Sequence, residues 1–232
     1  MNIKQFKYGA DNLSYLIYGE NSVLAIDGGA VEAILDFIGS AGLELQYITN
    51  THAHPDHTSG NRGLLEKSDA RILDHNTLAE DGRIVLDNET IRIYPTPGHT
   101  LDSVTFHWDR YLITGDTLFN GTVGTCFSGD LKAFYRSIQH LVELPGDTVV
   151  YAGHDYLEYA MTFARLVEPD NPDIDGYLAG YTPEHVFSRL EDELKVNPFL
   201  RYNHPEMIAI LKDRGSATAS EYQRFESVMH LE

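Results

Sequence analysis

The sequence THAHPDH at residues 51–57 places three histidines and an aspartate within six positions, directly after an apolar run at 45–49. An apolar run of this length predicts a strand, and the polar residues mark its end. In an extended segment alternate side chains point the same way, so His52 and His54 can reach one centre. The aspartate and histidine beyond the bend at Pro55 turn toward a neighbouring centre.

Three later apolar runs also end in a glycine followed by a ligand-type residue: "TPGHT" contains His99, "TGDT" contains Asp116 and "AGHDY" contains His154. A lone histidine would be assigned to ordinary structure, but this recurrence indicates that several strands present side chains to one edge of a sheet. Imidazole and carboxylate are ligands for zinc or iron. The candidate ligands suit two metal ions with Asp116 as a bridge, and they are His52, His54, Asp56, His57, His99, Asp116 and His154.

The remaining pattern predicts an α/β fold followed by a helical tail. Short β-branched and aromatic runs predict strands at 13–18, 22–27, 45–49, 71–74, 90–94, 103–108, 111–114 and 148–152, with helices at about 30–41, 60–67 and 130–144 between them. No strand-like run follows, and helices are expected at 156–167, 183–195, 205–213 and 219–230. Thr182-Pro183 is the expected start of the second of these helices, and Thr218 with Glu221 fits a capping box.

The polar stretch EPDNPDIDG at 168–176 is the expected boundary between a catalytic domain at 1–167 and a helical domain at 168–232.

Composition lowers the expectation of some partners. The 232 residues carry a formal net charge of −18, which disfavours nucleic acid or an anionic membrane surface as a partner. The sequence offers no signal-peptide core and no stretch of membrane-spanning length. A single cysteine, Cys126, excludes an intrachain disulfide and fits a reducing compartment, so a cytoplasmic protein is expected. The oligomeric state is not indicated.

The signature H-x-H-x-D-H at 52–57, followed in order by the three single ligands, resembles the metallo-β-lactamase superfamily. This resemblance implies a four-layered αββα sandwich. It also implies that His52, His54 and His99 hold a first metal, that Asp56, His57 and His154 hold a second, and that Asp116 lies between them. Asp27 resembles an aspartate that orients a ligand or loop behind such a site, although an ordinary strand-end turn explains it equally well.

The downstream third is similar to glyoxalase II, the hydroxyacylglutathione hydrolase, in the stretches "GHDY", "FARLVEPDNP" at 163–172 and "NPFLR" at 197–201. By that resemblance a metal-bound hydroxide attacks a thioester carbonyl, the catalytic residues are Asp56 and Asp116, and Tyr156 and Arg201 contact the substrate. Zinc is favoured, with iron or manganese as alternatives. Cys126 is not required, because the mechanism uses no protein nucleophile.

The sequence departs from the glyoxalase II pattern in the loop after Asp116. The family has a lysine and a tyrosine there, in a G-K-F-Y-E-G-like run that binds glutathione, whereas this chain reads GTCFSG. Thr125 replaces the lysine and Phe127 the tyrosine, so a cation and a hydroxyl are lost. By the resemblance both residues are still expected to contact the substrate. We therefore expect altered glutathione contacts, and another small thiol carrier is an alternative.

Two other functions are alternatives to thioester hydrolysis. Persulfide dioxygenases of the same superfamily use one iron, held at positions that match His52, His99 and Asp116, but they look shorter at the C-terminus than this chain. A metal-stabilised binding module without turnover is disfavoured, because no purely structural site needs the complete ligand set. Thioester hydrolysis is the preferred interpretation.

Overall fold

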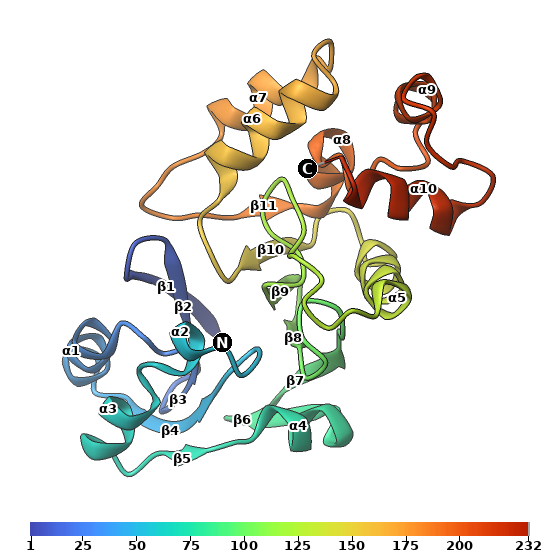
Figure 1. The fold of residues 1–232 in the computed structure, drawn as a ribbon. Coiled ribbons are helices and arrows are strands. Elements are labelled where there is room, and N and C mark those ends of the chain that lie inside the picture. The colour runs from blue at the N-terminus through green and yellow to red at the C-terminus, as the bar shows by residue number, and fades with distance from the viewer. Residues whose placement is uncertain (232) are drawn as a thin grey trace.

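The computed structural model describes residues 1–231 and contains two mixed β-sheets packed face to face (Figure 1). The first has the order β1-β2-β3-β4-β5 and the second the order β11-β10-β9-β8-β7-β6. The strands of the first sheet are β1 (Asn2–Tyr8), β2 (Asn12–Tyr18), β3 (Ser22–Ile26), β4 (Glu44–Thr49) and β5 (Arg71–Ile72). Those of the second are β6 (Arg83–Leu86), β7 (Glu89–Pro95), β8 (Val104–Trp108), β9 (Tyr111–Gly115), β10 (Val149–Ala152) and β11 (Ser188–Arg189).

Alternating side chains of these strands build separate apolar layers. In β3, Leu24 faces the interior between the sheets, whereas Val23 packs with the helices outside the first sheet. In β9, Ile113 enters the same inter-sheet interior, whereas Leu112 faces the helices outside the second sheet. Burial on both faces of a sheet requires cover on both sides, which gives the predicted four-layered αββα arrangement.

Helices α1 (Val31–Ala41) and α3 (Asn61–Glu66) cover the first sheet, and α5 (Leu131–Val142) covers the second (Figure 1). The Asp130 side chain caps α5 by accepting a hydrogen bond from the Ala133 amide at 2.9 Å. The α/β fold class and these helices are confirmed. The short helices α2 (Pro55–Thr58) and α4 (His75–Asp81) and the strands β1 and β6 were not predicted.

The C-terminal part is helical as expected, and its helices are α6 (Leu157–Val167), α7 (Asp173–Ala179), α8 (Leu190–Val196), α9 (Pro205–Asp213) and α10 (Glu221–Met229). Three details were wrong. Helix α7 was not predicted, and it begins within the polar stretch 168–176 that was expected to be a boundary. The helix expected at 183–195 begins only at Leu190, because the preceding residues pair as β11 with β10. The capping box of α10 is formed by Ser220 and Gln223 instead of Thr218 and Glu221, since the Ser220 hydroxyl accepts from the Gln223 amide at 3.2 Å.

The topology brings several strand ends to one edge of the sandwich. β4 lies parallel to β3, and β10 lies parallel to β9, so each pair ends at the same side of its sheet. The segments that follow β4, β7, β9 and β10 carry the candidate ligands. Within the described residues, no helix combines the length and apolar character needed to cross a membrane.

Candidate metal centre

All seven predicted ligand residues lie together at this edge, in two adjoining groups. Within each group the ligand atoms lie within 4.8 Å of one another. One group contains His52, His54, His99 and Asp116, and the other contains Asp56, His57 and His154.

In the first group three imidazole nitrogens converge. His54 Nδ1 lies 2.9 Å from His52 Nε2 and 3.0 Å from His99 Nε2. The opposite nitrogen of two of these rings has a protein partner: His99 Nδ1 is 2.9 Å from the carbonyl oxygen of Thr125, and His52 Nδ1 is 3.0 Å from Thr51 Oγ1. We assign the protons to the two Nδ1 atoms, which leaves both Nε2 lone pairs directed at one point. A metal cation fits such a set of donors.

The second group is held in the same way. His57 Nδ1 lies 2.9 Å from Asp27 Oδ2, and His154 Nδ1 lies 2.9 Å from Asp11 Oδ1. The two Nε2 atoms face each other at 3.2 Å. Carboxylate partners fix the tautomer and orientation of metal-binding imidazoles, which again leaves Nε2 as the free donor.

Asp116 lies between the two groups and is only 7% exposed. Its Oδ2 atom is 3.4 Å from His99 Nε2 and 3.5 Å from His154 Nε2, and its Oδ1 atom is 3.3 Å from His57 Nε2. Oδ1 is buried without a hydrogen-bond partner among the described residues. Buried acceptors that face other acceptors are unfavourable unless a cation lies between them, so Asp116 also fits a metal centre.

The glycines beside Asp116 allow this close approach. A Cβ at Gly153 would lie 2.1 Å from Asp116 Oδ1, and a Cβ at Gly124 would lie 1.8 Å from the Asp116 carbonyl oxygen. Neither contact is sterically possible. The glycine that precedes His154 in the sequence is therefore required by the packing of the candidate ligands.

The buried carboxylates of the cluster are stabilised by positive charge nearby. Burial lowers the pKa of His57, but Asp27 and Asp116 outweigh this effect and raise it to about 11. Burial opposes ionisation of Asp116, yet the adjacent imidazoles of His154 and His57 hold the pKa of its carboxyl well below the usual range. Burial lowers the pKa of His52 to about 4. A divalent cation would place positive charge beside the carboxylates, and the buried His52 imidazole could bind it in its neutral form.

Asp27 fits both of the interpretations that the sequence left open: it lies in a strand-end turn, where the Gly29 amide donates to its carbonyl oxygen at 2.7 Å, and its side chain orients its neighbours. It is 1% exposed, and its carboxylate accepts from the Thr51 amide at 2.8 Å and the Thr51 hydroxyl at 2.7 Å, in addition to His57. Asp27 therefore orients both a candidate ligand and the loop that begins the signature. Asp11 was missed, because it lies in the turn between β1 and β2 and carries no sequence signal of its own.

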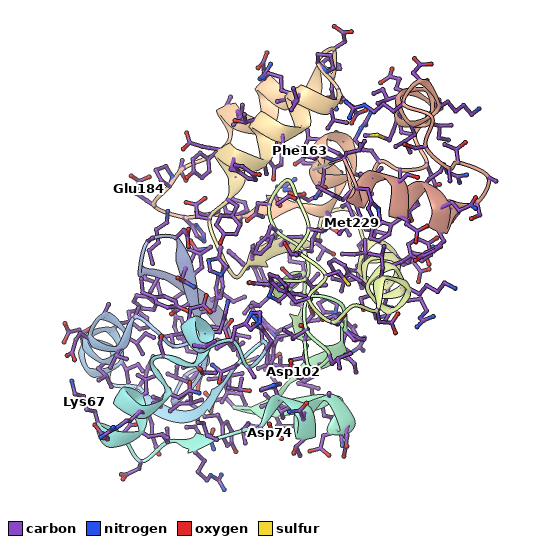
Figure 2. The ribbon with its side chains drawn as sticks, viewed as in Figure 1. Lys67, Asp74, Asp102, Phe163, Glu184 and Met229 are labelled. Atoms are coloured by element: carbon purple, nitrogen blue, oxygen red, sulfur yellow. The ribbon has the colours of Figure 1, made fainter. Side chains whose placement is uncertain are left out.

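The loop that carries His99 is tied to two helices. His75 at the start of α4 donates to Asp102 Oδ2 at 2.7 Å, and Asp102 is labelled beside α4 in Figure 2. Ser137 in α5 donates to the carbonyl oxygen of Pro97 at 2.7 Å. His75 thus supports the metal centre indirectly, through the loop that carries His99.

Three of the four predicted substrate contacts lie beside the cluster. Phe127 is 68% exposed, and its ring centre lies 5.2 Å from that of His99 and 5.9 Å from that of His54. The Tyr156 ring stacks on His154 at 5.0 Å. Thr125 has an exposed side chain, and its backbone carbonyl holds His99. Cys126 lies between Thr125 and Phe127 in the sequence, and its Sγ atom is 3.5 Å from Ser128 Oγ.

The fourth residue, Arg201, is engaged elsewhere. Its side chain is 6% exposed and forms two hydrogen bonds with Glu168, at 2.8 and 2.9 Å, and a third with the Lys195 carbonyl oxygen at 2.9 Å. Glu168 with His204 and Glu206 forms a third group of ligand-type residues, but the Arg201 guanidinium already binds its buried carboxylate. These contacts give Arg201 a structural role, and we do not retain it as a substrate contact.

Comparison with known families agrees with this geometry. Residues 9–83 and 71–154 match the family described as Metallo-beta-lactamase superfamily, and residues 155–230 match Hydroxyacylglutathione hydrolase C-terminus. A hydroxyacylglutathione hydrolase of Chromohalobacter salexigens is 32% identical over 226 residues, covering 89% of each chain. One from Anaeromyxobacter dehalogenans is 31% identical over 245 residues, covering 97% of this chain and 96% of the relative.

Solved structures share the fold. ETHE1 from Myxococcus xanthus superposes with a TM-score of 0.69 at 22% identity, covering 100% of this chain and 91% of that one. A metallo-beta-lactamase from Staphylococcus aureus has a TM-score of 0.63 at 20% identity, covering 99% of this chain and 72% of that one. At this level of identity the similarity concerns the fold alone.

Proposed function

We propose that this chain, which belongs to the metallo-β-lactamase superfamily and within it to the hydroxyacylglutathione hydrolase family, is a metal-dependent hydrolase of small thioesters. The observation that carries the proposal is the convergence of seven ligand-type side chains in two groups that adjoin at Asp116. The name of the relatives specifies a glutathione thioester as their substrate.

In this proposal His52, His54 and His99 hold one metal, Asp56, His57 and His154 hold another, and Asp116 is shared. Zinc is favoured, and iron or manganese are alternatives with the same ligands. Divalent ions at such a site supply a water of lowered pKa and polarise a carbonyl oxygen. The two carboxylates, Asp56 and Asp116, are the proposed catalytic residues of the chain.

The other residues orient and enclose the reacting groups. Asp27 and Asp11 fix the imidazoles of the second group, and the Thr125 carbonyl fixes His99. Burial raises the pKa of Tyr156 to about 12, so its hydroxyl stays protonated near neutral pH and can donate to a substrate. Phe127 offers an apolar surface beside the first group.

The charges around the cluster favour a thiol carrier that is less anionic than glutathione. The carboxylates of Asp11 and Asp56 are partly exposed, with side chains 38% and 45% accessible. Lys7 is paired with Asp155 at 2.5 Å, and Arg201 is paired with Glu168. Lys7 and Arg201 are therefore already paired, and neither replaces the cation that the chain lacks at Thr125.

We predict that replacing Thr125 by Lys lowers the Michaelis constant for S-lactoylglutathione. A charge-assisted hydrogen bond is worth about 1.5–3 kcal/mol, so a change of roughly ten-fold or more is expected. The turnover number should change little, because the Thr125 carbonyl that holds His99 is retained. Steady-state kinetics on the metal-loaded protein measure both constants.

Thr125→Met is the matched control, since it adds length without charge and should leave the Michaelis constant near that of the parent. Adding Phe127→Tyr to Thr125→Lys should improve binding further. If the parent already has a low micromolar Michaelis constant and Thr125→Lys changes nothing, the proposed account of the pocket is wrong.

A panel of thioesters tests the function itself. The metal-loaded protein should hydrolyse thioesters of small, weakly anionic thiols at least as well as S-lactoylglutathione, and without oxygen uptake. Oxygen consumption with a persulfide substrate, and no thioester cleavage, would favour the dioxygenase alternative.

The division at 167/168 remains a proposal, as does a cytoplasmic location. Separate expression of residues 1–167 tests the division, because an independent domain should unfold cooperatively by itself.

A further inference from the structure

The chain between Asp116 and Thr125 forms a small hairpin. Leu118 and Val123 form an antiparallel bridge, and the Phe119 amide donates to the Thr122 carbonyl oxygen at 3.0 Å. Asp116 precedes this hairpin by two residues, and Thr125 follows it by two. The position of the hairpin thus affects a candidate bridging ligand at one end and the partner of His99 at the other.

The tip of the hairpin is held by the C-terminal helical part. The Gly121 amide donates to both carboxylate oxygens of Glu193 in α8, at 3.1 and 2.9 Å. Asn197 Nδ2 donates to the Thr122 carbonyl oxygen at 3.1 Å, and Asn120 Nδ2 donates to Ser188 Oγ at 2.7 Å.

The tip also requires glycine at its turn. Gly121 has a φ of +88°, and a Cβ there would lie 2.5 Å from Met161 Cε in α6. Packing and hydrogen bonds therefore fix the same few residues.

Glu193 is a buried carboxyl group that the proposed chemistry does not use. It is 0% exposed, and its partners are neutral donors: the Gly121 amide, the Tyr177 hydroxyl and Asn197 Nδ2. Burial raises the pKa of this carboxyl. A buried carboxyl group costs free energy unless its oxygens are satisfied, and here two of its bonds are spent on the hairpin amide.

We propose that Glu193 is a positioning residue for the metal centre, which it serves by fixing the tip of the hairpin between Asp116 and Thr125. Loss of its bonds to Gly121 would free the tip, and the two ends of the hairpin would then hold Asp116 and His99 less rigidly. The inference rests on the metal-binding site alone and is tested without any thioester. Its failure is therefore distinguishable from failure of the proposed hydrolase activity.

The test compares Glu193→Gln with Glu191→Gln, which alters an exposed carboxylate in the same helix. Glutamine has the size of glutamate, but it replaces one acceptor oxygen by an NH2 group, which cannot accept a hydrogen bond from the donors that surround Glu193. We expect hydrogen–deuterium exchange of peptides spanning 117–125 to rise roughly ten-fold relative to peptides of β2 and β3, the factor expected for one lost charge-assisted bond. Release of bound zinc to a chelator, measured at a fixed interval below each Tm, should accelerate by a similar factor. Glu191→Gln should match the parent in both measurements.

A lower Tm without selective exchange in the hairpin, or with the zinc release rate of the parent, would assign Glu193 a merely structural role and overturn the proposal. If Glu193→Gln does not fold, Asn197→Ser is measured in the same way, because it removes the amide that holds Thr122. Selective exchange in the hairpin with faster zinc release would then support the proposal, and their absence would contradict it.

Discussion

Replacing Asp116 by Ala should remove most of the bound metal and nearly all of the hydrolytic activity. Asp116 is the only one of the seven predicted ligands expected to serve both metals, and its oxygens lie 3.3 Å from His57 and 3.4 Å from His99. Bound metal contributes several kcal/mol to transition-state stabilisation, and a loss of about 4 kcal/mol corresponds to a roughly thousand-fold fall in kcat/KM. Metal content should fall from about two ions per chain to below one.

His154→Ala provides the comparison, because it removes a ligand from the second group alone. It should retain about one ion per chain and lose less activity than Asp116→Ala. Asp213→Ala, at an exposed position in α9, controls for the loss of a carboxylate and should behave as the parent. Full metal content and unchanged turnover in Asp116→Ala would rule out its role as a shared ligand.

Replacing Arg201 by Met should lower the free energy of unfolding by about 3–5 kcal/mol, because it leaves the Glu168 carboxylate buried without its partner. The Glu168 side chain is 3% exposed, and both of its oxygens accept from Arg201. Chemical denaturation measures this change directly. The Michaelis constant of the folded variant should stay close to that of the parent.

Arg165→Met is the matched control. Arg165 pairs with Asp175 at 2.5 Å, but the two side chains are 46% and 83% exposed, so the loss should be within about 1 kcal/mol. A large rise in the Michaelis constant of Arg201→Met with little change in stability would instead return Arg201 to the substrate site.

Most of the candidate site could be predicted because its residues follow strand ends in a fixed pattern. A strand end followed by His or Asp leaves few choices for where that side chain lies. The strand before His52 ends at Thr49, and a glycine directly precedes each of the other three strand-end ligands, His99, Asp116 and His154. The family signature then gave the pairing of ligands. The ligand roles remain predictions, while the spatial grouping of the seven side chains is observed.

The features that could not be predicted depend on contacts between residues far apart in the sequence. Asp11 reaches His154 across 143 positions, and Glu168 meets Arg201 across 33, so neither pair leaves a local pattern. The expected helix at 183–195 failed because pairing with β10 outweighed local helix propensity around Ser188. In α10 two candidate caps lie two residues apart, Thr218 with Glu221 and Ser220 with Gln223, and both fit the capping-box pattern, so the local sequence does not distinguish them.

The most direct test of the central claim combines elemental analysis with turnover on one preparation of the full chain produced with ample metal. The proposal predicts about two divalent ions per chain and hydrolysis of a small thioester in the absence of oxygen uptake. A stable content of one iron per chain, with oxygen consumption on a persulfide and no cleavage of any thioester, would contradict it.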